Sequence, residues 1–390
     1  MTHDLFGPAP ILPPKSADET IRWLQLYRSR RVGPATFYRL MTEHGSAGAA
    51  LLALPEVARA SGVKNYACCD PMLAEQEYRA GMRAGFSLIC AGSPHYPIGF
   101  ARLSEAPPLF WAHGRLEFLS RPLLSIVGAR NASSLGTRMA RKLADDLGRA
   151  GFVVVSGLAR GVDAAAHLGA LPHGTIAVVA GGVDVVYPAE NTDLAANISR
   201  DGLVISEQPL GLQPQARHFP QRNRLISGLA KATIVIEAAL KSGSLITARN
   251  AGDQGRDVLV VPGHPFDGRS GGCNALIRDG ATLVRNADDV IEAIGTAKNE
   301  RQPLSQQIES HETLSGNPIK ETEYKPTVHP HQQKDVQSHI MALLSINPIA
   351  EDQLIRDLDL PSATVSAKLL DLELEGAIMR QSGGLLSRVI

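Results

Sequence analysis

Gly128 and Arg130 place a glycine loop and a fixed positive charge directly after an apolar run. Residues 123–127 have the length and composition of a strand, and residues 134–150 read as a helix that Ser133 or Ser134 can cap. A strand, a glycine loop and a helix start in succession offer backbone N–H groups and a positive dipole end to an anion, most often phosphate. We expect Gly128 to let the backbone approach that ligand closely. The alternative is a plain turn carrying a solvated arginine.

A second candidate is a basic run that contains no acidic residue, between Glu207 and Glu237. Its cationic residues are Arg217, His218, Arg222, Arg224 and Lys231, with Phe219 and Asn223 among them. Cations neutralise phosphates, and an unpaired base stacks on an aromatic ring or on a guanidinium plane. This run therefore predicts contact with nucleic acid. The alternative is a solvated helix start with Phe219 in the core.

Lys241 to Ser244 supply a third candidate, because Ser242, Gly243 and Ser244 precede a helix expected over residues 245–252. This is a second helix start suited to an anion. Two such starts beside one basic run favour a polyanion more than any of the three features alone.

The elements that position these residues alternate between strands and helices from residue 86 onward. The expected strands are residues 86–90, 109–112, 123–127, 152–155, 175–180, 203–206, 233–236, 258–261 and 282–284. Continuous apolar strands separated by helices predict an α/β fold with a parallel sheet covered on both faces. Ligands of such sheets bind at the carboxyl ends of the strands, which brings the three candidates, together with Ser156 and Gly157, to one rim.

Four regions are expected along the chain. Residues 1–85 are helical and resemble a SAM-like or helix-hairpin-helix module, with Arg31 to Pro34 as the turn. Residues 86–297 form the extended Rossmann-like sheet domain, and residues 298–333, polar and rich in proline, form a linker. Residues 334–390 predict a winged helix, whose hairpin turns at Ser382 to Gly384. This last region has five basic and eight acidic residues, so we expect it to contact protein rather than DNA.

Composition limits the classes of function. Lys+Arg and Asp+Glu are both 39, so a nucleic-acid site must come from local clustering of charge. The four cysteines show no CxxC spacing, no apolar stretch is long enough to span a membrane, and the first residues lack the pattern of a signal peptide. We therefore expect a cytoplasmic protein. The first loop lacks the dinucleotide fingerprint and the histidines lack metal-ligand spacing, so no cofactor and no metal are expected.

The ordered motifs of residues 86–295 closely resemble those of the DNA-processing protein A (DprA/Smf) family. They are Tyr96-Pro97 with Ala106-Pro107-Pro108, IVGAR at 126–130, SGLARGVDAAAH at 156–167, GGVD at 181–184, YPAEN at 187–191, FPQRNRLISGL at 219–229, IEAALKSGSLITAR at 236–249, GRDVLVVPG at 255–263 and NALIRDGA at 274–281. The resemblance implies a protein that binds and protects single-stranded DNA during natural transformation and helps to load the RecA recombinase. It also implies a homodimer formed through the Rossmann-like domain. The family's Gly-Ser/Ala-Arg loop falls on Gly128, Ala129 and Arg130, and its basic segment on residues 219–224.

The leading hypothesis is a binder of single-stranded DNA without catalysis. Its expected DNA-binding residues are Gly128, Ala129, Arg130, Ser156, Gly157, Arg160, Arg217, Phe219, Arg222, Asn223, Arg224, Lys231, Ser242, Gly243 and Ser244. One alternative is a Rossmann-like nucleotide hydrolase that uses Glu237 as a base, although we favour a Glu237 that holds Arg249 or Arg224. Another is an adaptor for RecA with weak DNA contact. Asp163 and His167, four residues apart on a helix, are expected to be a structural pair.

Overall fold

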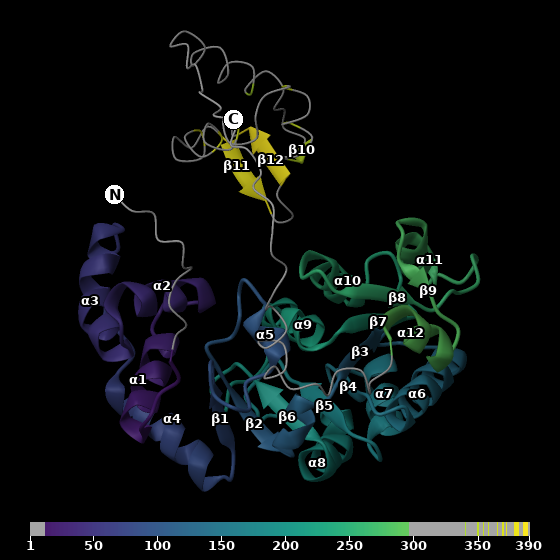
Figure 1. Ribbon diagram of the computed structural model, residues 1–390, viewed down its shortest axis with the longest axis horizontal. Coiled ribbons are helices and arrows are strands. Elements are labelled where there is room, and N and C mark those ends of the chain that lie inside the picture. The colour runs from purple at the N-terminus through teal and green to yellow at the C-terminus, as the bar shows by residue number, and fades with distance from the viewer. Residues whose placement is uncertain are drawn as a thin grey trace, which may run out of the picture. The chain divides into compact units, whose positions relative to one another are not determined.

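The computed structural model describes residues 12–295 and, further along the chain, three strands and several single buried residues (Figure 1). The chain divides into two compact units, Met1–Pro303 and Leu304–Ile390. Among the described residues, no helix is both long enough and apolar enough to cross a membrane.

The first unit begins with four helices: α1 (Ala17–Arg28), α2 (Pro34–His44), α3 (Ala47–Ala60) and α4 (Pro71–Arg83). Local sequence sets their ends. The Ser16 hydroxyl accepts the Glu19 amide at the start of α1, and Pro34 occupies the first turn of α2, where no backbone N–H is needed.

A nine-stranded sheet follows. Its strands are β1 (Ser87–Cys90), β2 (Leu109–Gly114), β3 (Leu123–Gly128), β4 (Val153–Ser156), β5 (Thr175–Val178), β6 (Leu203–Ser206), β7 (Ala232–Ile236), β8 (Asp257–Val260) and β9 (Thr282–Leu283). Each predicted strand is confirmed, with its bounds shifted by two residues at most. The order is β1-β2-β6-β5-β4-β3-β7-β8-β9. The prediction of a parallel sheet holds from β6 to β9, whereas β2 is antiparallel to both β6 and β1. Between β1 and β2 the chain turns back without a long crossover helix, so the two strands run in opposite directions.

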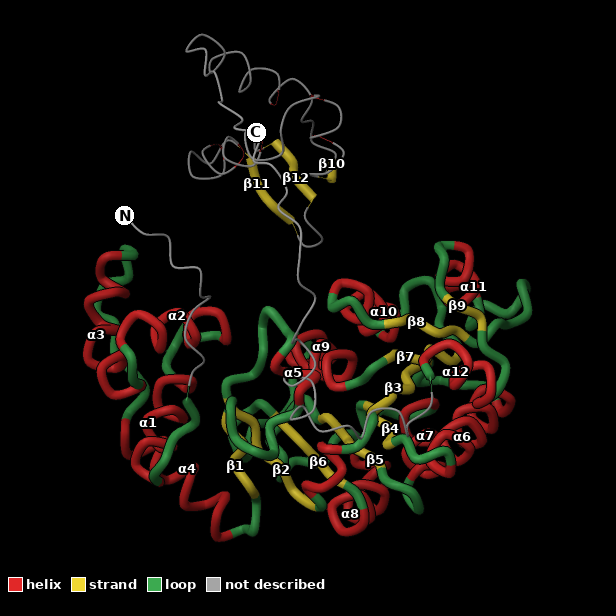
Figure 2. Tube along the Cα trace, in the orientation of Figure 1, coloured by secondary structure: helices red, strands yellow, loops and turns green. Residues whose placement is uncertain are grey.

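Helices cover both faces of the sheet (Figure 2). One layer contains α6 (Ser134–Arg149), α7 (Val162–Ala170), α8 (Thr192–Asp201) and α12 (Ala287–Ile294), and the other contains α5 (Ile98–Ala101), α9 (His218–Leu229), α10 (Ser244–Asp253) and α11 (Gly271–Arg278). Two short 3₁₀ turns, η1 (Leu116–Ser120) and η2 (Ala189–Asn191), complete the described elements of the first unit. Because successive side chains of β3 point to opposite faces of the sheet, this strand contacts both layers of helices. Leu124 and Ile126 pack with α6 and α7, while Val127 packs with α9.

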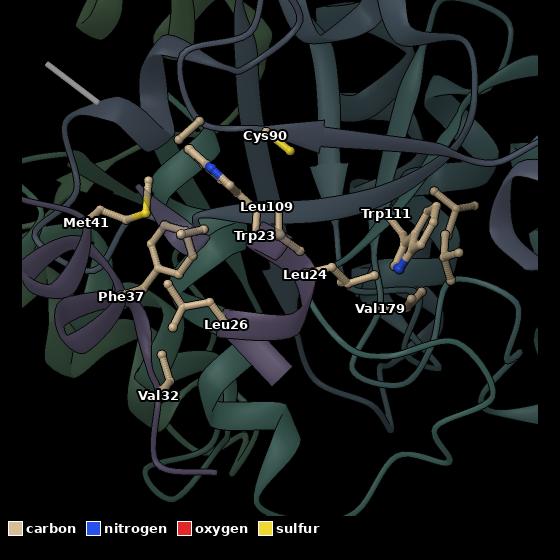
Figure 3. Packing of buried hydrophobic residues seen from close by; sticks show 14 of the residues in the cluster. Trp23, Leu24, Leu26, Val32, Phe37, Met41, Cys90, Leu109, Trp111 and Val179 are labelled. Atoms are coloured by element: carbon tan, nitrogen blue, oxygen red, sulfur yellow. The ribbon is translucent and has the colours of Figure 1, made fainter. Parts of the chain in front are cut away.

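The amino-terminal helices pack directly against the sheet domain. Trp23, Leu24 and Phe37 from α1 and α2 share one buried cluster with Leu109 and Trp111 from β2 (Figure 3). The Trp111 indole N–H donates to Glu77 of α4 at 2.8 Å. Apolar burial and a polar anchor therefore hold the helical module on the β2 side of the sheet.

The second unit contains β10 (Ile349–Ala350), β11 (Ile378–Gln381) and β12 (Leu385–Arg388), paired antiparallel in the order β10-β12-β11. The predicted hairpin about residues 382–384 is confirmed by the pairing of β11 with β12. Seven buried apolar residues of this unit form its own core cluster. The linker expected at 298–333 lies outside the described residues, as do most residues of the helices expected between 334 and 376.

Candidate nucleic-acid interface

A large pocket lies where the order of the strands reverses. The chain runs outward from β3 to β6 and then returns to place β7 on the other side of β3. The loops that follow β3 and β7 therefore flank one crevice, the usual ligand position in such folds. This switch-point pocket has a volume of about 850 Å³, and it contains nine of the predicted residues: Gly128, Ala129, Arg130, Phe219, Arg222, Asn223, Ser242, Gly243 and Ser244.

Arg130 forms a cationic and aromatic wall of this pocket with two rings. Its guanidinium carbon lies 5.1 Å from the centre of the Phe219 ring, which lies 5.6 Å from the Tyr187 ring. Arg130 is exposed and forms no ion pair with any carboxylate in the described part of the chain. The wall thus presents an uncompensated charge beside an aromatic face, the combination that binds phosphate and stacks bases.

The start of α10 forms the opposite wall. Gly243 stands at the N-cap position and provides no side-chain cap, and the neighbouring Ser242 and Ser244 hydroxyls lie 2.7 Å apart. Lys241 is exposed and forms no ion pair with a described carboxylate. The Ser242 hydroxyl accepts the Ser244 amide at a long 3.4 Å. A weakly capped helix start with a cation beside it can accept an anionic ligand.

The start of α6 is different, which corrects the first expectation. Glu237, at the end of β7, accepts the Ser133 amide at 2.8 Å and the Ser133 hydroxyl, while that hydroxyl accepts the Gly136 amide at 3.0 Å. The anion at this helix start is therefore an internal carboxylate rather than a phosphate. The interpretation that Glu237 holds Arg249 or Arg224 is wrong, because its partner is Ser133.

The glycines of the rim serve internal packing. A Cβ at Gly128 would overlap the Ile236 carbonyl oxygen, so this glycine allows β3 and β7 to meet rather than a ligand to approach. A Cβ at Gly157 would lie 2.5 Å from a guanidinium nitrogen of Arg222. Ser156 is fully buried and donates to the Ile126 carbonyl at 2.6 Å. Ser156 and Gly157, both predicted to bind DNA, instead shape the floor beneath the pocket.

Arg222 is a buried cation in that floor. Its Nη1 donates to the carbonyls of Gly157, at 2.6 Å, and of Val178, and its side chain is near the buried carboxyl of Asp163. Burial lowers the pKa of Arg222 to about 10, partly offset by the carboxylate of Asp163. Arg222 contributes positive potential to the pocket. Its Nη1 is engaged by internal carbonyls, whereas its buried Nε has no hydrogen-bond partner in the described part of the chain.

Asp163 and His167 have the expected structural role, with partners other than each other. The Asp163 carboxyl accepts the Gly157 amide at 3.1 Å, and His167 Nε2 accepts the Leu158 amide at 3.3 Å. His167 Nδ1 lies 2.7 Å from the Thr175 hydroxyl, and burial lowers the pKa of His167 to about 3. A neutral imidazole and a carboxyl group thus hold the loop that follows β4.

Arg224 does not face the pocket. Its Nη2 donates to both carboxylate oxygens of Glu207, at 2.7 Å and 2.6 Å, and the Glu207 side chain also accepts the Tyr27 hydroxyl. Glu207 is buried at 7% exposure. Because its guanidinium is committed to this internal pair, Arg224 is removed from the set of phosphate contacts.

The other predicted cations are distributed unevenly. Arg160 lies near the aromatic wall, 3.5 Å from Glu190, and Arg217 is exposed at the start of α9 but outside the lining of the pocket. Lys231 precedes β7, and its amide donates to Leu123 at the start of β3. Its backbone therefore lies at the opposite edge of the sheet from the pocket, a full strand length of about 15 Å away. Lys231 is thus wrongly placed among the site residues.

The expected DNA-binding residues leave out several that line the pocket, among them Tyr187, Lys241 and Arg269. Lys241 directly precedes the predicted Ser242, so the motif itself carried the signal. Arg269 belongs to the loop before α11 and pairs with Asp267 at 3.1 Å. No local pattern in the sequence points to Arg269, because only the fold brings this loop to the pocket.

Comparisons with known proteins agree with the fold. The model of the DNA recombination-mediator protein A family matches residues 87–295, that of a DprA-like N-terminal HHH domain matches 17–80, and that of a DprA winged helix domain matches 325–384. DNA processing protein DprA of Streptococcus pneumoniae is 45% identical over 198 residues, which cover 50% of this chain and 70% of that protein. Protein Smf of Synechocystis is 34% identical over 311 residues, 74% of this chain and 77% of that one.

Two solved structures are also similar. That of DprA from S. pneumoniae superposes with a TM-score of 0.60 at 36% identity, over 72% of this chain and 99% of that chain. That of DNA processing protein A from Helicobacter pylori, described for its single-stranded DNA binding mode, gives a TM-score of 0.50 at 31% identity, over 53% and 94% of the two chains. The switch-point pocket thus belongs to an α/β domain that follows a helical module and precedes a winged helix along the chain. With its core domain matched from end to end, the chain belongs to the DNA recombination-mediator protein A (DprA/Smf) family.

Proposed function

We propose that this protein binds single-stranded DNA in the switch-point pocket, without catalysis and without reading sequence. The observation that carries the proposal is a pair of exposed cations, Arg130 and Lys241, without ion-pair partners among the described residues. They flank the Phe219–Tyr187 ring pair and the weakly capped start of α10. Guanidinium and ammonium groups neutralise phosphates, and an aromatic face stacks any base. The relative from H. pylori, described as binding single-stranded DNA, supports the same ligand.

Within this proposal the lining residues have separate roles. Arg130 and Lys241 hold phosphates, and the backbone amides near Gly243 and Ser244 add donors without sequence preference. Arg269, which pairs with Asp267 at the surface, adds positive charge to the lining. Phe219 stacks a base. Asn223, whose amide nitrogen lies a long 3.4 Å from the Gly243 carbonyl, can turn its amide toward a base edge.

We also propose the wider role that the family resemblance implies. Bound strands would be protected and passed to the RecA recombinase during natural transformation, by a homodimer formed through the Rossmann-like domain. The description of the matched family as a recombination mediator supports this role. We further propose that the chain folds as separate domains at residues 1–85, 86–297 and 334–390, with the linker at 298–333. The acidic balance of the last one supports a protein contact rather than a DNA contact.

A nucleotide hydrolase that uses Glu237 is not favoured. The Glu237 carboxylate is occupied by the amide and hydroxyl of Ser133 at the start of α6. A general base must be able to reach the proton that it removes.

The test is charge reversal in the pocket, with fluorescence anisotropy of a labelled oligo-dT of about 20 nucleotides. Arg130→Glu with Lys241→Glu should weaken binding at least about tenfold. The slope of log K against the logarithm of the salt concentration should become shallower by about 1.4, because two phosphate contacts are lost. Lys64→Glu with Arg83→Glu makes the same change of charge at exposed positions of the helical module and should change affinity less than about twofold. Equal affinities for the pocket variant and the wild-type protein would reject the site.

A further inference from the structure

A second hollow lies between α6 and α7, in the layer of helices opposite the one that contains α9 and α10. This α6–α7 groove has a volume of about 520 Å³, and its lining includes Arg138, Arg141 and Lys142 of α6, Leu168 of α7, and Pro172. The two helices run side by side (Figures 1 and 2). They are in close contact at Gly169, where a Cβ would overlap the Arg141 carbonyl oxygen. The groove is thus part of a well-packed surface.

The charge of the groove is positive and only partly compensated. Arg138 and Arg141 are exposed and form no ion pair with any described carboxylate. Lys142 pairs with Asp146 at 2.8 Å. Asp145, the carboxylate in the lining, is already engaged by Arg149 at 2.7 Å and by His173 at 2.8 Å. Two guanidinium groups therefore remain available to an anion.

The stability of α6 does not account for this distribution of charge. Cations favour the carboxyl end of a helix and acids favour its amino end. In α6, Arg138, Arg141 and Lys142 come before Asp145 and Asp146. The pair Lys142–Asp146 also has the weaker of the two orientations for residues four apart. An anionic ligand outside the helix explains the order better than the helix itself does.

The groove also has apolar surface. Leu168 is 45% exposed, and Pro172 lies next to the groove's cations. Guanidinium groups beside exposed apolar carbon suit a flexible strand whose phosphates bind the cations while sugars or bases cover the carbon.

The groove is connected to the switch-point pocket through α6. Arg130 and Asn131 line the pocket, and α6 begins at Ser134. Arg138 is four residues further on, about 6 Å along the helix axis. A ligand that leaves the pocket past Arg130 therefore meets Arg138 and then Arg141 within a few nucleotides. This continuity favours a nucleic acid over an acidic peptide, which has no reason to adjoin the pocket.

We propose that the α6–α7 groove is a second contact for single-stranded DNA, which receives the strand where it leaves the switch-point pocket. The inference rests on the proposed function. It assigns Arg138 and Arg141 to phosphates that only a longer strand can bring to them.

The experiment compares two lengths of oligo-dT, about six and about 20 nucleotides. Arg138→Glu with Arg141→Glu should weaken binding of the longer strand about tenfold. For that strand, the slope of log K against the logarithm of the salt concentration should become shallower by about 1.4. The affinity for the shorter strand should change by less than about twofold. Lys64→Glu with Arg83→Glu is the matched control for net charge. Circular dichroism monitors folding, and Arg138→Gln with Arg141→Gln replaces the reversal variant if that variant unfolds.

The outcomes separate the two proposals. Loss confined to the longer strand supports the groove. Equal loss for both lengths, or no loss for either, overturns it, and in the latter case an acidic peptide becomes the better candidate for the groove. Failure of the wild-type protein to bind either strand would instead contradict the proposed function.

Discussion

At the scale of single residues, several glycines and arginines at the rim take part in internal packing rather than in the ligand contacts that their types suggest. Gly157 leaves space for the guanidinium of Arg222, and Gly128 leaves space for a neighbouring strand. Arg222 and Arg224 bond inside the protein, whereas Arg130 remains exposed. The type of a residue therefore indicates which interactions it can form, and its burial in the fold decides with which partner it forms them.

This difference between glycines predicts a contrast in stability. Gly157→Ala should lower the free energy of unfolding by about 1–3 kcal/mol, because its methyl group would press on a buried, hydrogen-bonded guanidinium. Gly243→Ala should change it by less than about 0.5 kcal/mol, since a Cβ there meets no atom within 4 Å and the backbone is αR. Urea denaturation measures both. Similar losses for the two variants would contradict the packing role of Gly157.

At the scale of elements, the loop after β4 depends on one histidine that must stay neutral. His167 Nε2 accepts the Leu158 amide, so the proton is on Nδ1, which faces the Thr175 hydroxyl. Thr175 in turn donates to the Val154 carbonyl. Protonation of Nε2 would place two donors against each other in a buried site.

Acid should therefore destabilise the protein through His167. Burial lowers the pKa of His167 from 6.5 to about 3, so the unfolded chain takes up a proton that the folded protein refuses. This stabilisation is complete above pH 6.5 and is lost as the pH falls, by about 2 kcal/mol between about pH 6.5 and pH 5. Denaturant unfolding of the wild type and of His167→Gln across this range measures it.

The informative quantity is the difference in the pH dependence of stability between the wild-type protein and His167→Gln. Burial raises the pKa of Asp163, which acts in the opposite direction, but Asp163 is present in both proteins and its contribution cancels. The variant should show the smaller dependence on pH. Parallel curves would mean that His167 is not the group responsible.

At the scale of the whole first unit, a buried polar group connects the helical module to the sheet domain. Glu207 accepts the Tyr27 hydroxyl of α1 and both bonds from Arg224 of α9, while Arg28 donates to the Glu207 carbonyl at 3.1 Å. Arg28 also pairs with Glu77 at 2.9 Å. The helix that carries Phe219 and Asn223 is thus joined to α1 through one carboxylate.

Removing this carboxylate should be costly. Glu207→Gln should lower the free energy of unfolding by about 3 kcal/mol, because a mostly buried Arg224 loses its counter-charge. Arg224→Gln should have a similar cost, and the double variant should lose at least about 1 kcal/mol less than the sum. A double-mutant cycle in urea measures this coupling. The exposed pair Arg59–Glu56 is the control and should couple by less than about 0.5 kcal/mol.

Much of the fold could be predicted because its signals are local. The strands β3, β4 and β6 are apolar runs that end on Gly128, Ser156 and Ser206, and the Ser133 cap of α6 follows from its type and position. The placement of the site at the carboxyl ends of the strands also follows from an alternation of strands and helices. These inferences needed only neighbouring residues.

The sequence by itself determined the order of elements, the family motifs and the presence of many cations near one rim. The tertiary structure decided which of those cations are free. Glu237 is 104 residues from Ser133, and Glu207 is 17 residues from Arg224, so no local pattern announces either partner. The physical reason is that charge and hydrogen-bonding capacity belong to the residue, while desolvation and pairing depend on what the fold brings beside it.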